Sequence, residues 1–165
     1  HPDLTRDFIF SIGAYNVRST EINAVIGRSQ LRTLDDRNEV RRQNAKIFFE
    51  NLSSEFIKPD PTGSCSYALV LILRARNIKL RDAIEDLLRR LGVEFRRGLS
   101  GGGNQLRQPY LKGYGYDEKR LAREFPNTEH VHSFGWYIGN YIDLEKWKII
   151  HLCNELNALV GDTNV

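Results

Sequence analysis

An α+β fold with a small, mainly antiparallel sheet is predicted by three features of this sequence. Two stretches near its start, residues 20–34 and 35–52, carry apolar side chains at helical spacing and predict two long helices. Short apolar segments of strand length follow at residues 65–74, 93–96 and 136–140. Between and after these segments the apolar spacing becomes helical again. Few strands and many helices favour a sheet that helices cover mainly on one face.

The composition is typical of a soluble globular protein and argues against several function classes. The 165 residues are 41% hydrophobic and 27% charged, which is enough to build one core. The net charge of +3 is small and mixed in sign, so we expect no nucleic-acid partner. The longest apolar run, residues 67–73, is too short to cross a bilayer, and no secretory pattern opens the sequence. We therefore expect a cytoplasmic protein without a membrane partner.

Cysteine and histidine spacing predicts no metal site. Cys65 and Cys153 lie far apart with no CxxC or histidine-rich spacing, so we expect reduced, structural thiols. His130 and His132 fall on different faces of a helix, and we interpret both as packing or surface residues. His151 lies beside the apolar stripe of the last helix, where we expect a buried edge residue. No catalytic triad or carboxylate pair has a useful spacing, so we predict no catalytic residue in this chain.

A polar loop runs directly into the first predicted helix. Ser19 and Thr20 are good N-cap residues, and Glu21 suits the positive end of the helix dipole. The first turn of a helix leaves backbone N–H groups unpaired, and Asn16 and Arg18 stand just before it. Two interpretations stay open: a phosphate-binding site, or an ordinary capped helix with a surface arginine.

The later helices are predicted from apolar periodicity and from residues that favour helix ends. The clearest covers residues 79–91, where leucines and other apolar side chains repeat at helical spacing before Gly92. For the others we expect Asp117 and Asn127 as N-caps of short helices that end near Phe125 and Phe134, and a last helix from Asp143 to Gly161.

The segment over residues 96–110 contains consecutive glycines followed by polar side chains. Glycine permits backbone conformations that other residues avoid and lets a ligand approach closely. Four residues of interest follow the glycines: Asn104, Arg107, Gln108 and Tyr110. They supply hydrogen-bond donors, one charge and an aromatic face, which suit a phosphorylated, hydroxyl-rich ligand. A binding loop and a plain connector both remain open, and the glycine spacing matches neither a dinucleotide fingerprint nor a P-loop.

Several sequence motifs, taken together, resemble one known enzyme family. The segment over residues 15–34 reads YNVRSTEINAVIGRSQLRTL and is followed at residues 41–45 by RRQNA. Later segments read GNQLRQP at residues 103–109 and FGWYIGN at residues 134–140. In these motifs the chain resembles the DegT/DnrJ/EryC1/StrS family of pyridoxal 5'-phosphate (PLP)-dependent sugar aminotransferases.

The resemblance implies roles for particular residues. In this family the asparagine that matches Asn16 contacts the PLP phosphate of the neighbouring subunit. We therefore expect Asn16 and Arg18 to bind the cofactor in a homodimer with shared active sites. The expected substrate is a nucleotide-linked 4-keto-6-deoxy sugar, used in lipopolysaccharide or other deoxysugar synthesis. The residues expected to contact the sugar or its diphosphate are Asn104, Arg107, Gln108 and Tyr110.

The later motifs are most similar to the branch of the family that contains the nucleotide-sugar 3-dehydratases. In that branch a histidine replaces the lysine that holds the cofactor. The deciding position would lie before His1, so the resemblance leaves amino transfer and 3-dehydration both open. A dehydratase would also imply a reductase partner.

The chain is expected to be part of a longer protein. It begins at His1 and contains no methionine, and the family places a large PLP-binding domain before the Asn16 loop. We expect residues 1–53 to link to that domain through the long helices. Residues 54–165 are expected to form the small C-terminal domain of a fold-type-I PLP enzyme. The chain alone is then expected to be inactive, and a non-catalytic dimerisation or ligand-binding module remains the alternative.

Overall fold

The computed structural model describes residues 19–99 and 103–162 of the chain. The chain divides into two compact units, residues 1–35 and 36–165. In the described part of the first unit, helix α1 spans Glu21–Leu31. The Thr20 side chain caps this helix as predicted, because its Oγ1 accepts a hydrogen bond from the Asn23 backbone N–H at 3.3 Å.

The second unit holds the remaining helices and strands, apart from the start of α2. They are α2 (Leu34–Asn51), β1 (Ala68–Ile72), α3 (Ile78–Arg90), β2 (Phe95–Arg97), the 3-10 helices η3 (Gln105–Arg107) and η4 (Pro109–Tyr114), α4 (Glu118–Glu124), α5 (Pro126–Phe134), β3 (Gly135–Gly139) and α6 (Lys146–Asp162).

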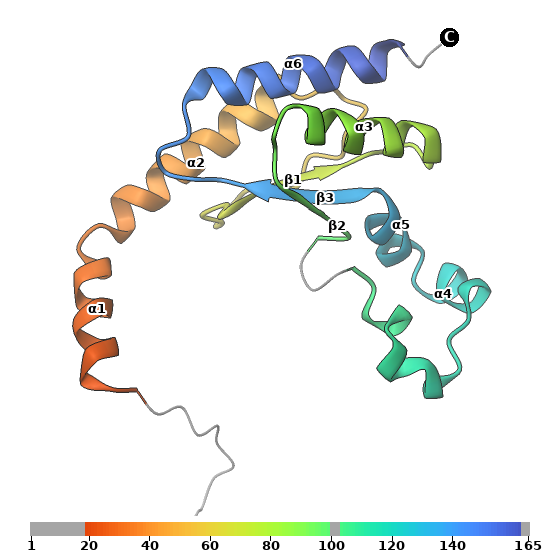
Figure 1. Cartoon of the computed structure of the whole chain (residues 1–165), viewed down its shortest axis with the longest axis horizontal. Helices are drawn as coiled ribbons and strands as arrows, with labels where there is room; N and C mark the ends of the chain where they lie inside the picture. Colours follow the sequence, from red (N-terminus) through yellow and green to blue (C-terminus); the bar gives the residue numbers. More distant parts are fainter. Residues whose placement is uncertain (1–18, 100–102, 163–165) are drawn as a thin grey trace, which may run out of the picture. The chain divides into compact units, whose positions relative to one another are not determined.

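The three strands form one antiparallel sheet in the order β1-β3-β2, which confirms the predicted fold class. In the register, Leu71 pairs with Trp136 and Phe95 pairs with Ile138. Strand side chains alternate between faces, so Leu71, Trp136 and Ile138 are buried on one face while Tyr137 lies on the other. Helices α3 and α6 contact each other on the buried side of the sheet (Figure 1).

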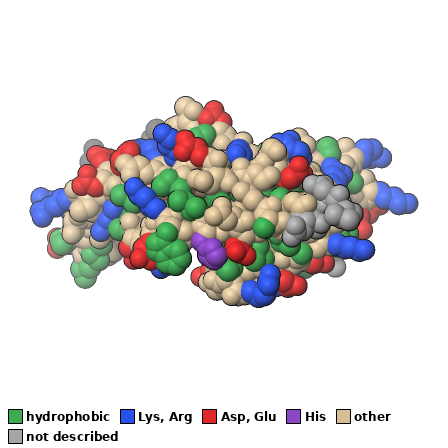
Figure 2. All heavy atoms as spheres, turned by 90° about the horizontal axis from the view of Figure 1, so that it is seen from above, with side chains coloured by type: hydrophobic (Ala, Val, Ile, Leu, Met, Phe, Trp, Pro, Cys, Tyr) green, Lys and Arg blue, Asp and Glu red, His purple; other side chains and the backbone are tan. Residues whose placement is uncertain are grey.

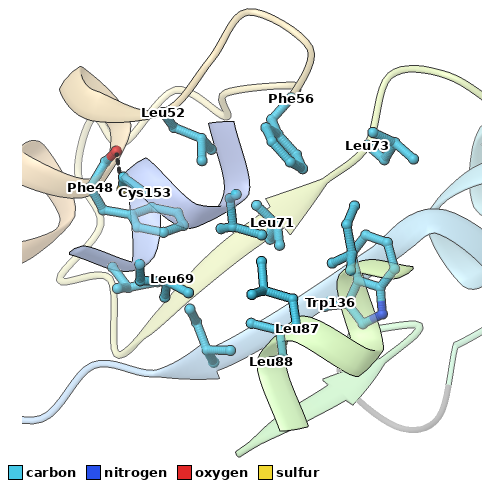
Figure 3. Packing of buried hydrophobic residues seen from close by; sticks show 14 of the residues in the cluster. Phe48, Leu52, Phe56, Leu69, Leu71, Leu73, Leu87, Leu88, Trp136 and Cys153 are labelled. Carbon is cyan, nitrogen blue, oxygen red and sulfur yellow. Dashed lines mark hydrogen bonds between the residues drawn. The ribbon is translucent and has the colours of Figure 1, made fainter. Parts of the chain in front are cut away.

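The core gathers side chains from α2, the sheet, α3 and α6 (Figure 3). Phe48 of α2 and Cys153 of α6 meet in it, and the Cys153 thiol donates a hydrogen bond to the Phe48 carbonyl oxygen at 3.5 Å. Burial raises the pKa of Cys153 to about 11. Cys65 is half-buried, and both cysteines are free thiols, as the spacing predicts.

A buried carboxylate ties α3 to the sheet. Glu85 is only 6% exposed, and its Oε1 accepts a hydrogen bond from the Trp136 indole N–H at 3.0 Å. Arg97 Nε lies 3.3 Å from the same oxygen, and Arg89 pairs with Oε2 at 2.9 Å. The carboxylate is thus buried with three partners, Trp136, Arg97 and Arg89, and such pairing is the condition for a carboxylate to be tolerated in a core.

An amide pair joins α2 to the end of β3. Asn140 and Asn44 are both buried, and Asn44 donates to Asn140 Oδ1 at 3.1 Å. Asn140 in turn donates to the backbone carbonyls of Arg41 and Ser66, at 2.9 and 2.7 Å. Both asparagines belong to the family-like motifs of the sequence, and here they act as structural ties.

Some predicted positions are wrong. Helix α5 begins at Pro126 with no side-chain cap, so Asn127 is not its N-cap. Proline suits the first helical position because its missing N–H would be unpaired there anyway. Helix α6 begins at Lys146 rather than Asp143, and His151 is exposed rather than buried. The Asp117 cap of α4 is confirmed, with its side chain accepting from the Arg120 N–H at 2.8 Å.

Surface charges of both signs are interspersed on the face that Figure 2 shows. Within the described residues, none of the helices has the length and apolar character needed to cross a bilayer.

Candidate functional site

The segment after the glycines folds back onto helix α5. Asn104 is 3% exposed and caps η3, since its Oδ1 accepts a hydrogen bond from the Leu106 N–H at 3.1 Å. Its amide nitrogen Nδ2 donates to Glu129 Oε1 at 2.7 Å, and its backbone N–H donates to His132 Nδ1 at 3.1 Å. Three separate groups of one residue are therefore fixed by the protein itself.

Arg107 forms a bidentate ion pair with the same Glu129. The guanidinium Nε lies 2.9 Å from Oε1 and 3.1 Å from Oε2, and Nη2 also contacts Oε2. The third nitrogen, Nη1, lies 3.2 Å from Glu118 Oε1, whose side chain is 84% exposed. By contrast, the Glu129 side chain is only 11% exposed. Such paired, charge-assisted hydrogen bonds are strong and fix the orientation of the arginine.

The charges of this cluster shift its proton equilibria. Hydrogen bonds from Arg107, and then from Asn104, hold the pKa of Glu129 below its ordinary value, although burial opposes this. The Glu129 carboxylate raises the pKa of Arg107 further above its already high value. Burial and then the Arg107 charge lower the pKa of His132. A neutral His132 is also what the geometry requires, because Nδ1 accepts the Asn104 N–H and the ring proton must then be on Nε2.

We call this arrangement the Arg107–Glu129 cluster: Asn104, Arg107, Glu118, Glu129 and His132. The residues of the cluster come from the loop that contains η3, from the start of α4 and from α5. Helix α5 leads without a gap into β3, the central strand, so the cluster is attached to the sheet through the backbone.

Not every predicted site residue joins the cluster. Asn104 and Arg107 do, and they meet through Glu129 rather than around an open space. Gln108 follows η3 and is half-buried, and its side chain makes no hydrogen bond within the described residues. Tyr110 belongs to η4, but its side chain lies outside what the structure describes, as do Asn16 and Arg18.

Three residues of the cluster, Glu118, Glu129 and His132, were not predicted as site residues from the sequence. The spacing of two between His130 and His132 separates those rings. His130 lies away from the cluster, with its Nε2 2.7 Å from the Leu73 carbonyl oxygen and its ring against Phe134. The relevant spacing is the three positions from Glu129 to His132, which places both on one face of α5.

The described residues do not form a PLP cradle by themselves. A cofactor of this kind needs a lysine or a substitute for it beside the ring and donors around the phosphate. The lysines whose side chains are described are all exposed: Lys46, Lys58, Lys79, Lys119, Lys146 and Lys148. The described part of the chain also holds no cluster of metal-ligating side chains. The residues present therefore fit a supporting role, and no chemical step is assigned to them.

A separate hollow of about 950 Å³ opens where β3 ends and α6 begins. Its lining includes Tyr137, Trp147 and Arg96 but none of the predicted site residues. It is thus distinct from the Arg107–Glu129 cluster.

Comparisons with known proteins find relatives that are named as sugar 3-dehydratases. The chain is 32% identical to a GDP-4-keto-6-deoxy-D-mannose 3-dehydratase of Yersinia pseudotuberculosis over 143 residues, which are 84% of this chain and 35% of that relative. The corresponding protein of Escherichia coli O55:H7 is 26% identical over 138 residues, 81% of this chain and 34% of that relative. The chain thus spans about a third of the length of these relatives.

Solved structures share the fold. A GDP-4-keto-6-deoxymannose-3-dehydratase with a trapped PLP–glutamate geminal diamine matches 91% of this chain and 39% of its own, with a TM-score of 0.70 and 24% identity. A putative sugar aminotransferase from Streptococcus pneumoniae matches 92% of this chain and 38% of its own, with a TM-score of 0.74 and 12% identity. The fold is that of part of the fold-type-I PLP enzymes, as the sequence predicts.

The family model of the DegT/DnrJ/EryC1/StrS aminotransferase family matches residues 3–157, nearly the whole chain. Its motifs, its similarity to the sugar 3-dehydratases and its fold agree, and the chain belongs to the DegT/DnrJ/EryC1/StrS aminotransferase family.

Proposed function

We propose that the protein containing this chain is a PLP-dependent enzyme that acts on a nucleotide-linked 4-keto-6-deoxy sugar. The observation that carries the proposal is the family match over residues 3–157 together with the 32% identity to a sugar 3-dehydratase. A non-catalytic dimerisation or ligand-binding module is the alternative, and it predicts neither cofactor binding nor turnover.

Two reactions fit such an enzyme. Removal of the sugar 3-hydroxyl is favoured by the relatives, since both are GDP-4-keto-6-deoxy-D-mannose 3-dehydratases. Amino transfer is the second candidate, supported by the family's description and by the likeness to a putative sugar aminotransferase. The two differ in whether a lysine or a histidine stands beside the cofactor, at a position that the family places before the Asn16 loop.

In this proposal the chain supports the cofactor and orients the sugar. PLP supplies the electron sink when bound. Asn16 and Arg18 would hold its phosphate from the neighbouring subunit of a homodimer. The loop residues Asn104, Arg107, Gln108 and Tyr110 would lie along the sugar or its diphosphate. In this arrangement the groups that react with the substrate are supplied by other parts of the protein, so the chain alone would be inactive.

Further parts of the proposal follow from the same reaction class. We place the enzyme in the cytoplasm, in a pathway to lipopolysaccharide or another deoxysugar polymer, and a dehydratase would work with a reductase. Residues 1–53 would link the two domains, and residues 54–165 would form the small domain.

The test uses the whole reading frame that carries this chain, purified and incubated with PLP. We expect a visible absorbance band that changes when L-glutamate is added. With GDP-4-keto-6-deoxymannose, a 3-deoxy product identified by mass spectrometry would indicate the dehydratase, and an amino sugar the aminotransferase. Absence of both the cofactor band and any product would reject the enzyme in favour of the binding module.

A further inference from the structure

We propose that Glu129 is a positioning residue that makes Arg107 and Asn104 the support of the loop rather than its ligand-binding groups. The loop over residues 103–108 then meets the neutral, hydroxyl-bearing sugar of the substrate and not its diphosphate. The inference that the loop contacts the sugar rather than the diphosphate rests on the proposed function. The support role of Glu129 does not rest on it, because that role is a property of the folded chain.

The first argument is that the guanidinium of Arg107 already pairs with two carboxylates of the protein. Glu129 engages Arg107 Nε and Nη2, and Glu118 lies 3.2 Å from Nη1. One positive charge therefore faces two carboxylates. A diphosphate approaching Arg107 would meet an excess of negative charge and would be repelled rather than attracted.

The second argument is burial. The Glu129 side chain is only 11% exposed, so a phosphate that displaced it from Arg107 would leave a poorly hydrated carboxylate without its cation. Breaking a pair that is this far covered costs more than breaking a pair on the surface. Arg107 is itself partly covered, with 29% of its side chain exposed. The pair is accordingly a fixed part of the fold.

The third argument concerns Asn104, whose side-chain oxygen, side-chain nitrogen and backbone N–H are each already bonded within the protein. Its Nδ2 donates to Glu129, its Oδ1 accepts from Leu106, and its backbone N–H donates to His132. The residue is also almost fully buried, at 3% exposed. Its contribution is to hold the first turn of η3 in place.

Among the described side chains of the four predicted binding residues, the one left for a ligand is that of Gln108, which is neutral. The Gln108 side chain is half-buried and makes no hydrogen bond within the described residues, and it carries both a donor and an acceptor. A neutral amide suits the hydroxyl and carbonyl groups of a sugar. Both of these groups accept hydrogen bonds, and the hydroxyls also donate them. Gln108 directly follows Arg107 at the end of η3, so the cluster fixes the backbone from which this amide extends.

The support role is tested first, by hydrogen exchange on the whole protein without ligand. In Glu129→Gln and in Arg107→Lys, we expect amide exchange in the peptide over residues 103–108 to accelerate by about tenfold or more, because charge-assisted hydrogen bonds are lost. Glu118→Gln is the matched control, which removes the same charge from the exposed partner of the same arginine. Its expected acceleration is below about threefold. Equal exchange in the wild type and in Glu129→Gln would overturn the proposal.

The ligand role is tested by calorimetry with two probes, GDP and GDP-mannose. The difference between their affinities measures what the sugar adds. In Arg107→Lys we expect the affinity for GDP to stay within about twofold of the wild type, while the gain from the sugar shrinks. A fall of about tenfold in GDP affinity would identify Arg107 as a diphosphate anchor and overturn the inference. If neither probe binds the wild type, the proposed function fails for these ligands, and the exchange experiment still decides the role of Glu129.

Discussion

Gly103 and His132 lie so close together that a Cβ atom on residue 103 would meet His132 Nδ1 at 2.2 Å. Gly103 also has a φ of +85°, a conformation that side chains rarely adopt. The same ring nitrogen accepts the backbone N–H of Asn104. The close approach and the hydrogen bond depend on each other, so this short contact sets the path of the loop.

Substitution of Gly103 tests this contact. Gly103→Ala is expected to lower the free energy of unfolding by more than the ~1–2 kcal/mol that a left-handed residue with a side chain costs. Gly63→Ala is the matched control, because Gly63 has a φ of +74° with nothing within 4 Å of the added Cβ. Urea denaturation of both variants separates the two effects. Equal losses would mean that the ring yields easily and that the contact is unimportant.

Removal of the buried Glu85 carboxylate should destabilise the second unit. Glu85→Ala leaves the Trp136 indole N–H without its acceptor and Arg97 without its carboxylate. We expect a loss of about 2–4 kcal/mol in the free energy of unfolding. Asp86→Ala provides the comparison, since Asp86 also pairs with Arg89 but is 72% exposed, and we expect ~0–1 kcal/mol. A loss for Glu85→Ala no larger than for Asp86→Ala would contradict a structural role of the carboxylate.

Stability should fall in mild acid through His132. The folded state holds the pKa of His132 below its ordinary value of 6.5, by burial and by the Arg107 charge, while Glu129 opposes the shift and Arg97 adds to it. The unfolded chain therefore takes up a proton at higher pH than the folded chain, so the free energy of unfolding decreases as the pH falls through the ordinary value of 6.5 towards the lower pKa of the folded state.

The variant His132→Asn checks this origin, because an amide oxygen can replace Nδ1 as acceptor but does not titrate. We expect a shallower dependence of stability on pH in this range, measured by urea denaturation at each pH. His151→Asn controls for the loss of a histidine from the exposed surface. An unchanged slope in His132→Asn would show that the acid effect arises elsewhere.

The two cysteines should differ in reactivity. The thiolate is the reactive form, and burial raises the pKa of Cys153 to about 11. Cys65 is half-buried and lies outside the core. At about pH 8, iodoacetamide is expected to label Cys65 and to spare Cys153 until denaturant is added, as peptide mapping would show. Labelling of both at the same rate in the native protein would contradict the packing around Cys153.

Regular elements with strong apolar patterns were predictable from the sequence. The amphipathic stretch at residues 79–91 predicted α3, which spans Ile78–Arg90, because its apolar stripe and the following Gly92 mark its length. The start of α5 was not predictable from the usual capping residues. It depends on Pro126, which needs no partner for a backbone N–H.

The candidate site was predictable only in part. Asn104 and Arg107 were identified as members of one loop, but their interactions depend on Glu129, which lies 22 positions beyond Arg107. Local sequence cannot show whether an arginine faces a ligand or a distant carboxylate, because that depends on how the chain folds back. The same limit applies to His132, whose partner Asn104 is 28 positions away.

A steady-state assay of the whole reading frame tests the proposed enzyme and the role of Glu129 together. It follows the loss of GDP-4-keto-6-deoxymannose with PLP and L-glutamate, in the wild type and in Glu129→Gln. We expect PLP-dependent consumption by the wild type and, in Glu129→Gln, a KM raised by about tenfold with the bound cofactor unchanged. A wild type that binds no PLP and consumes no sugar would contradict the proposed function, and a Glu129→Gln variant with wild-type KM and kcat would contradict the role of the cluster.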